Sequence, residues 1–233
     1  TVRAQQANSE SKAAEQRLDE LRENQRERER VVYTLQSRID TLQAQAPQQD
    51  IREHLDDSWH DLVDLVRADA GWEAALSAAL GEYAKALAGP VSAELLAGAG
   101  DSTRAVLVDT SRDGAAWHVD TAVQAEWLVD HITVDSSVAV AVGRVLADVV
   151  VAEDYSAAVE LIAEDPRLRA VTRDGLLVGE GWVEVGSHAG SAVERSSEIA
   201  KAQQGLRVAQ AELEQLSGTI EGAKQSAEEA RLD

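Results

Sequence analysis

Cysteine, methionine and phenylalanine are absent from this chain of 233 residues. Without cysteine there can be no disulfide framework, thiolate metal site or cysteine nucleophile, and the redox compartment stays open. No stretch resembles a signal peptide, and the most apolar run, residues 138–151, is interrupted by Arg144 and Asp148. We therefore expect a cytoplasmic protein with no membrane span. The missing initial methionine and the polar ends suggest a piece of a longer protein.

Basic residues are also scarce, since 22 Lys and Arg stand against 42 Asp and Glu, for a formal net charge of -20. The imbalance is concentrated in residues 47–194, which hold nine basic and 27 acidic residues. Residues 1–46 are balanced, with eight of each sign, and residues 195–233 hold five basic and seven acidic residues. The sequence thus divides into an acidic middle and two nearly neutral ends.

The N-terminal part, residues 1–46, contains no glycine or proline. Its apolar positions recur every three or four residues, which predicts a coiled-coil arm that ends before Pro47. Gln25 and Arg28 are two polar positions on the same face. The predicted apolar seam is Ala14, Leu18, Leu21, Val32, Leu35, Ile39 and Leu42.

The C-terminal part, residues 195–233, repeats this pattern and predicts a second arm. If Leu42 lies beside Ile199, antiparallel pairing places Leu35 beside Leu206 and sets Arg28 against Leu213. Gly205, Gly218 and Gly222 are expected outside the seam. Two independent helices in an unrelated bundle are the alternative. The seam is Ile199, Ala202, Leu206, Ala209, Leu213, Leu216, Ile220, Ala223, Ala227 and Ala230.

The middle, residues 47–194, contains a weak internal duplication. Residues 93–97 match residues 159–163, and Asp109 matches Asp174. Each copy is predicted to run helix, strand, helix, strand: 71–80, 83–88, 91–97 and 104–109, then 136–146, 147–151, 155–163 and 168–172. A mixed α/β (α+β) fold follows, with two related lobes at about 47–130 and 131–194. Chance similarity between alanine-rich amphipathic stretches is the alternative.

The second copy continues into a glycine-rich stretch, residues 175–190. Asp174-Gly175 is a tight-turn signal, and 176–178 and 182–185 are predicted to form a strand hairpin. A phosphate-binding loop is not indicated, because no lysine follows Gly186 and the spacing is wrong. The G-x-S-x-G spacing of a nucleophile elbow is absent as well. The glycines therefore indicate either turn chemistry or an edge strand that a second chain approaches closely.

Three stretches together resemble the hinge domain of SMC (structural maintenance of chromosomes) proteins. They are AGWEAALSAALG at 70–81, VTRDGLLV at 171–178 and the glycine-bearing tail to Gly190. The likeness is to the actinobacterial type, in which a tryptophan follows the Asp-Gly strand, as Trp182 does here. The tail is one glycine short of the family pattern, and 109–135 match poorly.

The resemblance implies a homodimer in which the glycine-bearing edge of one lobe meets the other lobe of its partner. The implied interface residues are Gly175, Gly179, Gly181, Trp182, Gly186, Ser187 and Gly190. It also implies that the arms lead to ATPase heads that bind ATP and Mg. Because the chain contains no Walker A sequence, we expect no ATP hydrolysis, catalytic residue or cofactor in this segment.

Further partners implied by the resemblance are kleisin-type proteins and chromosomal DNA, in a condensin-like complex that acts in chromosome segregation at the nucleoid. An acidic α/β ligand-binding or sensor domain inserted in a coiled-coil signalling protein is the alternative function. The five histidines are scattered, so no metal site is expected. Four arginines between positions 22 and 30 alternate with glutamates, which favours a salt-bridged helix face over a DNA-binding patch.

Overall fold

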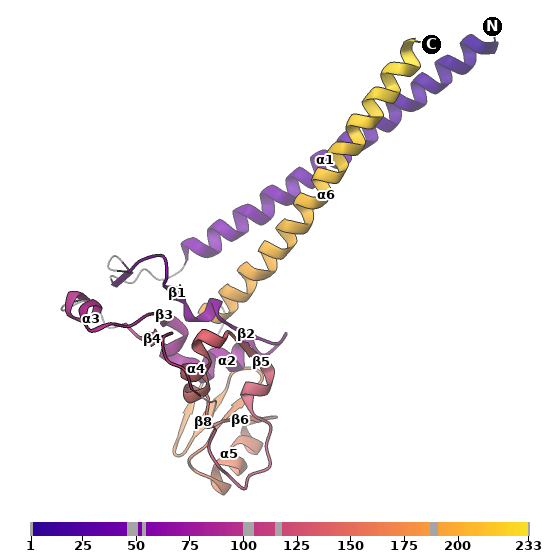
Figure 1. Cartoon of the computed structure of the whole chain (residues 1–233). Coiled ribbons are helices and arrows are strands. Elements are labelled where there is room, and N and C mark those ends of the chain that lie inside the picture. The colour runs from indigo at the N-terminus through magenta and orange to yellow at the C-terminus, as the bar shows by residue number, and fades with distance from the viewer. Residues whose placement is uncertain are drawn as a thin grey trace. The chain divides into compact units, whose positions relative to one another are not determined.

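The computed structural model describes residues 2–45, 51–52, 55–99, 105–114, 118–186 and 191–232. The chain forms two compact units, one from residues 1–45 with 199–233 and one from residues 46–198 (Figure 1). The first contains two long helices, α1 (Val2–Ala44) and most of α6 (Ala192–Leu232). The second holds all the strands and shorter helices. The mixed α/β class predicted from the sequence is confirmed.

In the helical unit, most of the predicted seam side chains are less exposed than their neighbours, and the side chain of Ala230 lies outside those described. α1 ends at Ala44, shortly before Pro47, whose ring cannot continue a helix. The side chains along the contact are small or branched apolar groups, as expected for a narrow coiled-coil seam. Those that are buried are Ile39, Ala202, Ala209, Ile220 and Ala227.

Two contacts define how α1 and α6 pair. Nη1 of Arg28 lies 2.8 Å from Oε2 of Glu212. A Cβ placed on Gly205 would lie 3.5 Å from Cδ1 of Leu35. Since one number rises as the other falls, the helices are antiparallel, within one residue of the register that places Leu35 beside Leu206. The structure corrects the expectation for Gly205, which lies in the contact with Leu35 rather than outside the seam.

The strands of the other unit form three small sheets. The first has the order β1-β3-β4 (His60–Asp61, Leu87–Gly89, Leu107–Asp109), with β3 and β4 parallel. The second pairs β2 (Val66–Ala68) with β5 (Ile132–Val134). The third has the order β6-β7-β8-β9 (Val149–Ala152, Arg169–Thr172, Leu177–Gly179, Trp182–Glu184), and only β6 and β7 are parallel.

Helices connect and cover these sheets. The α-helices are α2 (Glu73–Leu80), α3 (Ala93–Ala99), α4 (Ala139–Val145) and α5 (Tyr155–Glu164). The short 3₁₀ segments are η2 (Leu62–Asp64), η3 (Gly81–Lys85), η4 (Leu128–His131) and η5 (Ser136–Val138). Asp154 starts α5, because its carboxylate accepts a hydrogen bond from the Ala157 amide at 2.9 Å.

Both halves contain a parallel strand pair joined through a helix, β3-α3-β4 and β6-α5-β7, in the predicted order. One predicted strand, 83–88, is wrong over most of its length. Residues 81–85 form η3, and the strand begins only at Leu87. Gly81, at φ 53°, reverses the chain after α2, so the backbone reaches the sheet later than the alternation suggested. The strands β1, β2 and β5 were not predicted.

The third sheet separates two apolar cores. Val149, Val171 and Leu177 face the larger core, which includes residues of α2, α4 and the start of α6. Val150, Ala170 and Val178 face the smaller core under α5. Strands buried on both faces read as continuous apolar runs, which explains the Val149-Val150-Val151 sequence. The larger core draws residues from both predicted lobes, so they share one interior.

Candidate dimer interface

The β8–β9 hairpin supplies the exposed strand edge of this unit. In the described part of the chain, β9 pairs with β8 alone, and all three of its residues are exposed. Trp182 retains 44% of its accessible surface and Val183 retains 40%. An unpaired strand edge with apolar side chains is a template for pairing with another chain. The hairpin is therefore the first candidate for an interface.

The two faces of β9 present different side chains. In the antiparallel register, Val183 stands opposite Val178, and residues paired in this way point to the same face. Val183 therefore lies on the α5 side of the sheet, where Val178 is buried. Trp182 and Glu184 line a cavity of about 430 Å³ on the other side. A partner at this edge would meet an apolar side chain on each face of β9.

The predicted turn at Asp174-Gly175 is confirmed. Gly175 has φ 89°, a left-handed conformation that favours glycine, and its amide donates to the carbonyl of Thr172 at 2.9 Å. The hydroxyl of Thr172 accepts from the Leu176 amide at 3.0 Å and donates to the carboxylate of Asp174. Gly175 is buried at the β7–β8 turn.

Gly179 lies directly beneath the Trp182 indole of its own hairpin. It stands opposite Trp182, and a Cβ on Gly179 would lie 2.2 Å from Cε2 of the indole. The absent side chain thus makes room for a tryptophan of the same hairpin. Gly181 has φ 75° and forms the turn between the two strands. These three residues lie together at the closed end of the hairpin.

The remaining predicted interface residues continue beyond β9. Gly186 follows the strand, is exposed, and has open space where a Cβ would be. Ser187 and Gly190 lie outside the described residues. Among the described members of the predicted set, Gly175 and Gly179 are buried, whereas Gly181, Trp182 and Gly186 are exposed.

Arg169 lines the cavity beside Trp182. The sequence patterns did not identify it as a site residue. The guanidinium of Arg169 donates to both carboxylate oxygens of Asp148, at 2.8 and 2.7 Å. It also donates to the carbonyls of Val145 at 2.6 Å and Ala79 at 3.4 Å. Arg169 thereby links β7 to the ends of α4 and α2. Arg169 begins β7, two residues before the VTRDG stretch, but its partners Asp148, Val145 and Ala79 lie far away in sequence.

A second open edge is found on the first sheet. In the described residues, β4 pairs with β3 alone, whereas the corresponding strand of the second half, β7, has β8 on its far side. The end of β4 carries Asp109, whose carboxylate accepts from the Ser111 hydroxyl at 2.7 Å and the Ser111 amide at 3.0 Å. These hydrogen bonds lower the pKa of Asp109 to about 2, so this edge ends in a stably charged group.

Other candidate sites are weaker. Among the described residues, no three His, Asp or Glu side chains gather in a way that could hold a metal ion. None of the described helices is apolar enough over sufficient length to cross a membrane. The four arginines between positions 22 and 30 all form ion pairs: Arg22 pairs with Asp19, Arg26 with Glu23, Arg30 with Glu27 and Arg28 with Glu212. This arrangement agrees with a salt-bridged helix face.

The described tryptophans pack in or beside the apolar cores and sheets, with one exception. Trp72 is buried in the larger core, stacked on His131 with ring centroids 3.8 Å apart, and the Arg173 guanidinium lies 4.7 Å from its centroid. Trp59 lies over Gly89, and Trp127 packs against the smaller core. Trp117 lies outside the described residues. Trp182 differs from the described others in its exposure at a strand edge.

Comparison with known proteins connects this geometry to a family. A family model described as the SMC proteins flexible hinge domain matches residues 55–162. The chromosome partition protein Smc of Mycolicibacterium paratuberculosis is 38% identical over 224 residues, which cover 90% of this chain and 19% of that protein. The Smc protein of Mycobacterium tuberculosis is 35% identical over 234 residues, with the same two coverages. The chain thus spans about a fifth of the length of these curated relatives.

A solved structure agrees. The SMC hinge domain of Geobacillus stearothermophilus, crystallised as an asymmetric dimer, superposes with a TM-score of 0.61 at 20% identity and covers 98% of both chains. That identity supports the fold, and the mycobacterial relatives agree with the actinobacterial type indicated by the sequence. None of these matches favours a sensor domain in a signalling protein. The chain belongs to the SMC hinge family.

Proposed function

We propose that this chain is the hinge segment of a chromosome partition protein and that two copies associate through the β9 edge. The observation that carries the proposal is the exposure of Trp182 and Val183 on an unpaired three-residue strand. A soluble monomer gains nothing from such an edge, which invites aggregation unless a partner covers it. The dimeric state of the Geobacillus relative supports the same conclusion.

The open edge of β4 is the proposed place for the partner's β9. In the second half, the position beside β7 is filled by β8, but the equivalent position beside β4 is vacant among the described residues. Strand addition there would satisfy backbone groups on both edges and bury Trp182 and Val183 between two sheets. Because each copy has one of each edge, two copies related by twofold symmetry would make two such contacts.

The wider role follows from the relatives. We infer that the antiparallel arms continue toward ATPase heads outside this sequence, which would bind ATP and Mg. Kleisin-type proteins, chromosomal DNA and a nucleoid location are proposed for the whole protein. With 27 acidic and nine basic residues in 47–194, we expect this segment itself to bind duplex DNA weakly at physiological salt.

Sedimentation or light scattering tests the proposal directly. The chain has a mass of 25.0 kDa, and we expect about twice that value in solution at micromolar concentration. Trp182→Ala and Val183→Asp should each weaken the dimer about tenfold or more, because both side chains lie at the centre of the proposed contact. Val208→Asp, on an exposed position of α6, is the matched control and should leave the mass unchanged.

A chain that remains at 25.0 kDa across the micromolar range would refute the proposed dimer. A dimer that withstands both β9 substitutions would place the interface elsewhere. Circular dichroism on each variant separates loss of association from loss of folding.

A further inference from the structure

The outer face of α5 carries an apolar stripe that no part of the described chain covers. Tyr155 and Val159 are 54% and 41% exposed, although such side chains are usually buried in a helix that packs on a sheet. They are four residues apart and therefore adjacent on the helix surface, and Ala163 continues the row. The opposite face of α5 is already used, because Ala158 and Ile162 pack in the smaller core. We call Tyr155, Val159 and Ala163 the α5 stripe.

Acidic side chains border the stripe. Glu160 and Glu164 follow its members by one residue and form a parallel exposed row, and Glu153 lies just before the helix. None of these three glutamates forms an ion pair within the described chain. There is no Lys or Arg between Val145 and Pro166. The α5 stripe is thus bordered by negative charge that no ion pair among the described residues neutralises.

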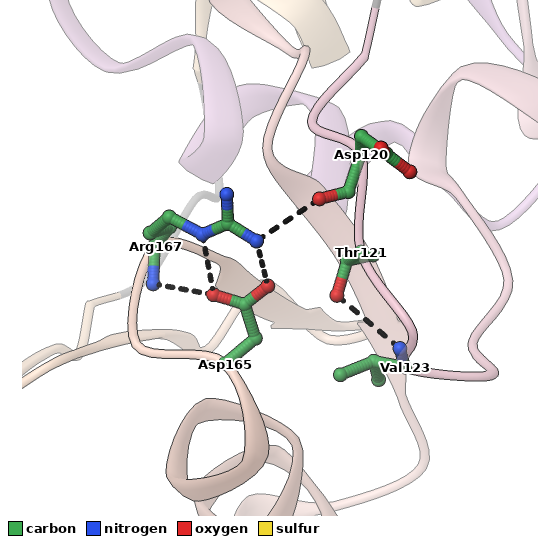
Figure 2. A network of polar contacts seen from close by, with 5 residues as sticks. All are labelled: Asp120, Thr121, Val123, Asp165 and Arg167. Carbon is green, nitrogen blue, oxygen red and sulfur yellow. Dashed lines mark hydrogen bonds and ion pairs between the residues drawn. The ribbon is translucent and has the colours of Figure 1, made fainter.

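Arg167, the nearest arginine that follows α5 in the sequence, already has hydrogen-bond partners. Its guanidinium donates to both carboxylate oxygens of Asp165, at 2.9 and 2.7 Å, and to the carbonyl of Asp120 at 2.9 Å (Figure 2). Hydrogen bonds from Arg167 and Thr121 hold the pKa of Asp165 below its ordinary value, so the pair stays ionised. Arg167 thus links the segment around Asp120 to the end of α5 through hydrogen bonds. Because its guanidinium is used in this way, it does not neutralise Glu160 or Glu164.

The negative charge around the α5 stripe limits which kinds of macromolecule can bind there. A second copy of the hinge unit is a poor occupant of this face, because the acidic rim of the α5 stripe would meet a unit that is itself strongly acidic. The β9 contact proposed above rests instead on backbone pairing and on Trp182 and Val183. Nucleic acid and anionic lipid surfaces are disfavoured for the same reason. A polypeptide that presents apolar side chains between lysines or arginines complements both features. The tyrosine ring adds a favourable site for a cation.

We propose that the outer face of α5 binds a basic amphipathic segment of another protein, whose apolar side chains pack on Tyr155 and Val159 while its cations pair with Glu160 and Glu164. The contact combines a small apolar anchor with a charged rim, the usual anatomy of a protein–protein interface. It is independent of the β9 edge, so one chain can engage a second copy and this partner at the same time.

A defined probe tests the proposal with the full chain. The probe is a fluorescein-labelled helical peptide of about 14 residues, with leucines spaced four apart and lysines at the remaining exposed positions. Anisotropy titration at physiological salt should show saturable binding to the unaltered chain. Tyr155→Ser with Val159→Ser should weaken binding about tenfold, because the apolar anchors are removed. The matched control is Val208→Ser, an exposed valine on α6, which should bind the peptide normally.

A charge comparison removes the possibility that the peptide simply adheres to an acidic protein. Glu160→Gln with Glu164→Gln should weaken binding about threefold to fivefold, as expected for two partly exposed pairs. Asp57→Asn with Glu94→Gln removes the same charge from other exposed sites and should leave binding unchanged. These surface substitutions avoid any dependence on how the Tyr155 and Val159 variant folds.

Two results would overturn the proposal. One is equal weakening by both pairs of charge substitutions, since this would show attraction without a site. The other is an NMR titration in which the peptide shifts resonances outside residues 153–164 and leaves α5 unchanged. Sedimentation of the α5 variants distinguishes this proposal from the proposed dimer: their mass should equal that of the unaltered chain, whatever that mass is.

Discussion

The indole of Trp182 lies across Gly179, so closely that a Cβ on the glycine would fall 2.2 Å from Cε2 of the ring. The same relationship occurs in the first sheet, where a Cβ on Gly89 would fall 2.3 Å from Cδ2 of Trp59. Gly179 is paired with Trp182 across antiparallel strands, and Trp59 immediately precedes β1, the antiparallel neighbour of the strand that ends at Gly89. Because glycine has no side chain, each tryptophan ring can pack directly on the backbone of its glycine. Aromatic residues often cover strand glycines in this way.

Gly179→Ala should therefore displace Trp182. The added methyl group cannot be accommodated without moving a ring or a strand, and overpacking of this kind costs about 1–3 kcal/mol. We expect a lower free energy of unfolding in urea and a shift of the Trp182 indole N–H resonance in NMR spectra. The displaced ring should also weaken self-association, since it belongs to the proposed contact.

Gly186→Ala is the matched control, because a Cβ at Gly186 meets open space and its φ is not left-handed. It should leave both the unfolding free energy and the Trp182 resonance close to those of the unaltered chain. If Gly179→Ala behaved like this control, the close approach of the indole to Gly179 would be wrong.

Much of the fold was accessible from local patterns. The heptad spacing located both arms, because an apolar period near 3.5 is typical of a coiled-coil helix, and the assumption that Leu42 lies beside Ile199 gave their antiparallel register. The Asp174-Gly175 signal located the β7–β8 turn, since glycine adopts φ 89° without strain. The order of α2, α4, α5 and their strands followed from alternation of apolar and turn residues. These features are all determined by neighbours in sequence.

The features that were missed depend on distant contacts. The close approach of the Trp182 indole to Gly179 becomes visible only when β8 and β9 are paired. Gly205 was placed outside the seam because its contact with Leu35 comes from the other arm. The role of Arg169 rests on Asp148, Val145 and Ala79, which only the tertiary fold brings together.

Charge reversal across the arms tests their register. Nη1 of Arg28 lies 2.8 Å from Oε2 of Glu212, with both side chains about half exposed. Arg28→Glu should lower the unfolding free energy of the arms, and the further change Glu212→Arg should restore it. An exposed pair of this kind contributes about 0.2–1 kcal/mol, and high salt should reduce the difference. Thermal unfolding followed by circular dichroism measures the cycle, and failure of the second change to restore stability would contradict this register.

Acid should lower the free energy of unfolding by protonating Asp109 at the end of β4. Hydrogen bonds from the Ser111 hydroxyl and amide lower the pKa of Asp109 from 3.8 to about 2. A carboxylate whose pKa is lower in the folded state stabilises the fold above its unfolded pKa, and this contribution is lost as pH falls through the folded value. We expect the stability difference between the unaltered chain and Asp109→Asn to shrink between about pH 4 and pH 2.

Urea unfolding of both proteins over this pH range gives the difference directly, and the other carboxylates cancel because both proteins contain them. A difference that stays constant with pH would show that the Asp109 carboxylate gains nothing from its charge.

Substitution of Arg169 tests how much its hydrogen bonds with Asp148 stabilise the fold. Its side chain and that of Asp148 are each only about a quarter exposed, at 25% and 26%, and they share two hydrogen bonds of 2.8 and 2.7 Å. Arg169→Met leaves the Asp148 carboxylate partly buried without its cation, which should cost about 2–4 kcal/mol in urea unfolding. Asp148→Asn alone removes the charge and weakens the same bonds. In the double variant no unpaired charge remains, so its cost should be clearly smaller than the sum of the two single costs. Additive costs would instead show that Arg169 acts mainly through the carbonyls of Val145 and Ala79, because only those bonds are lost independently of Asp148.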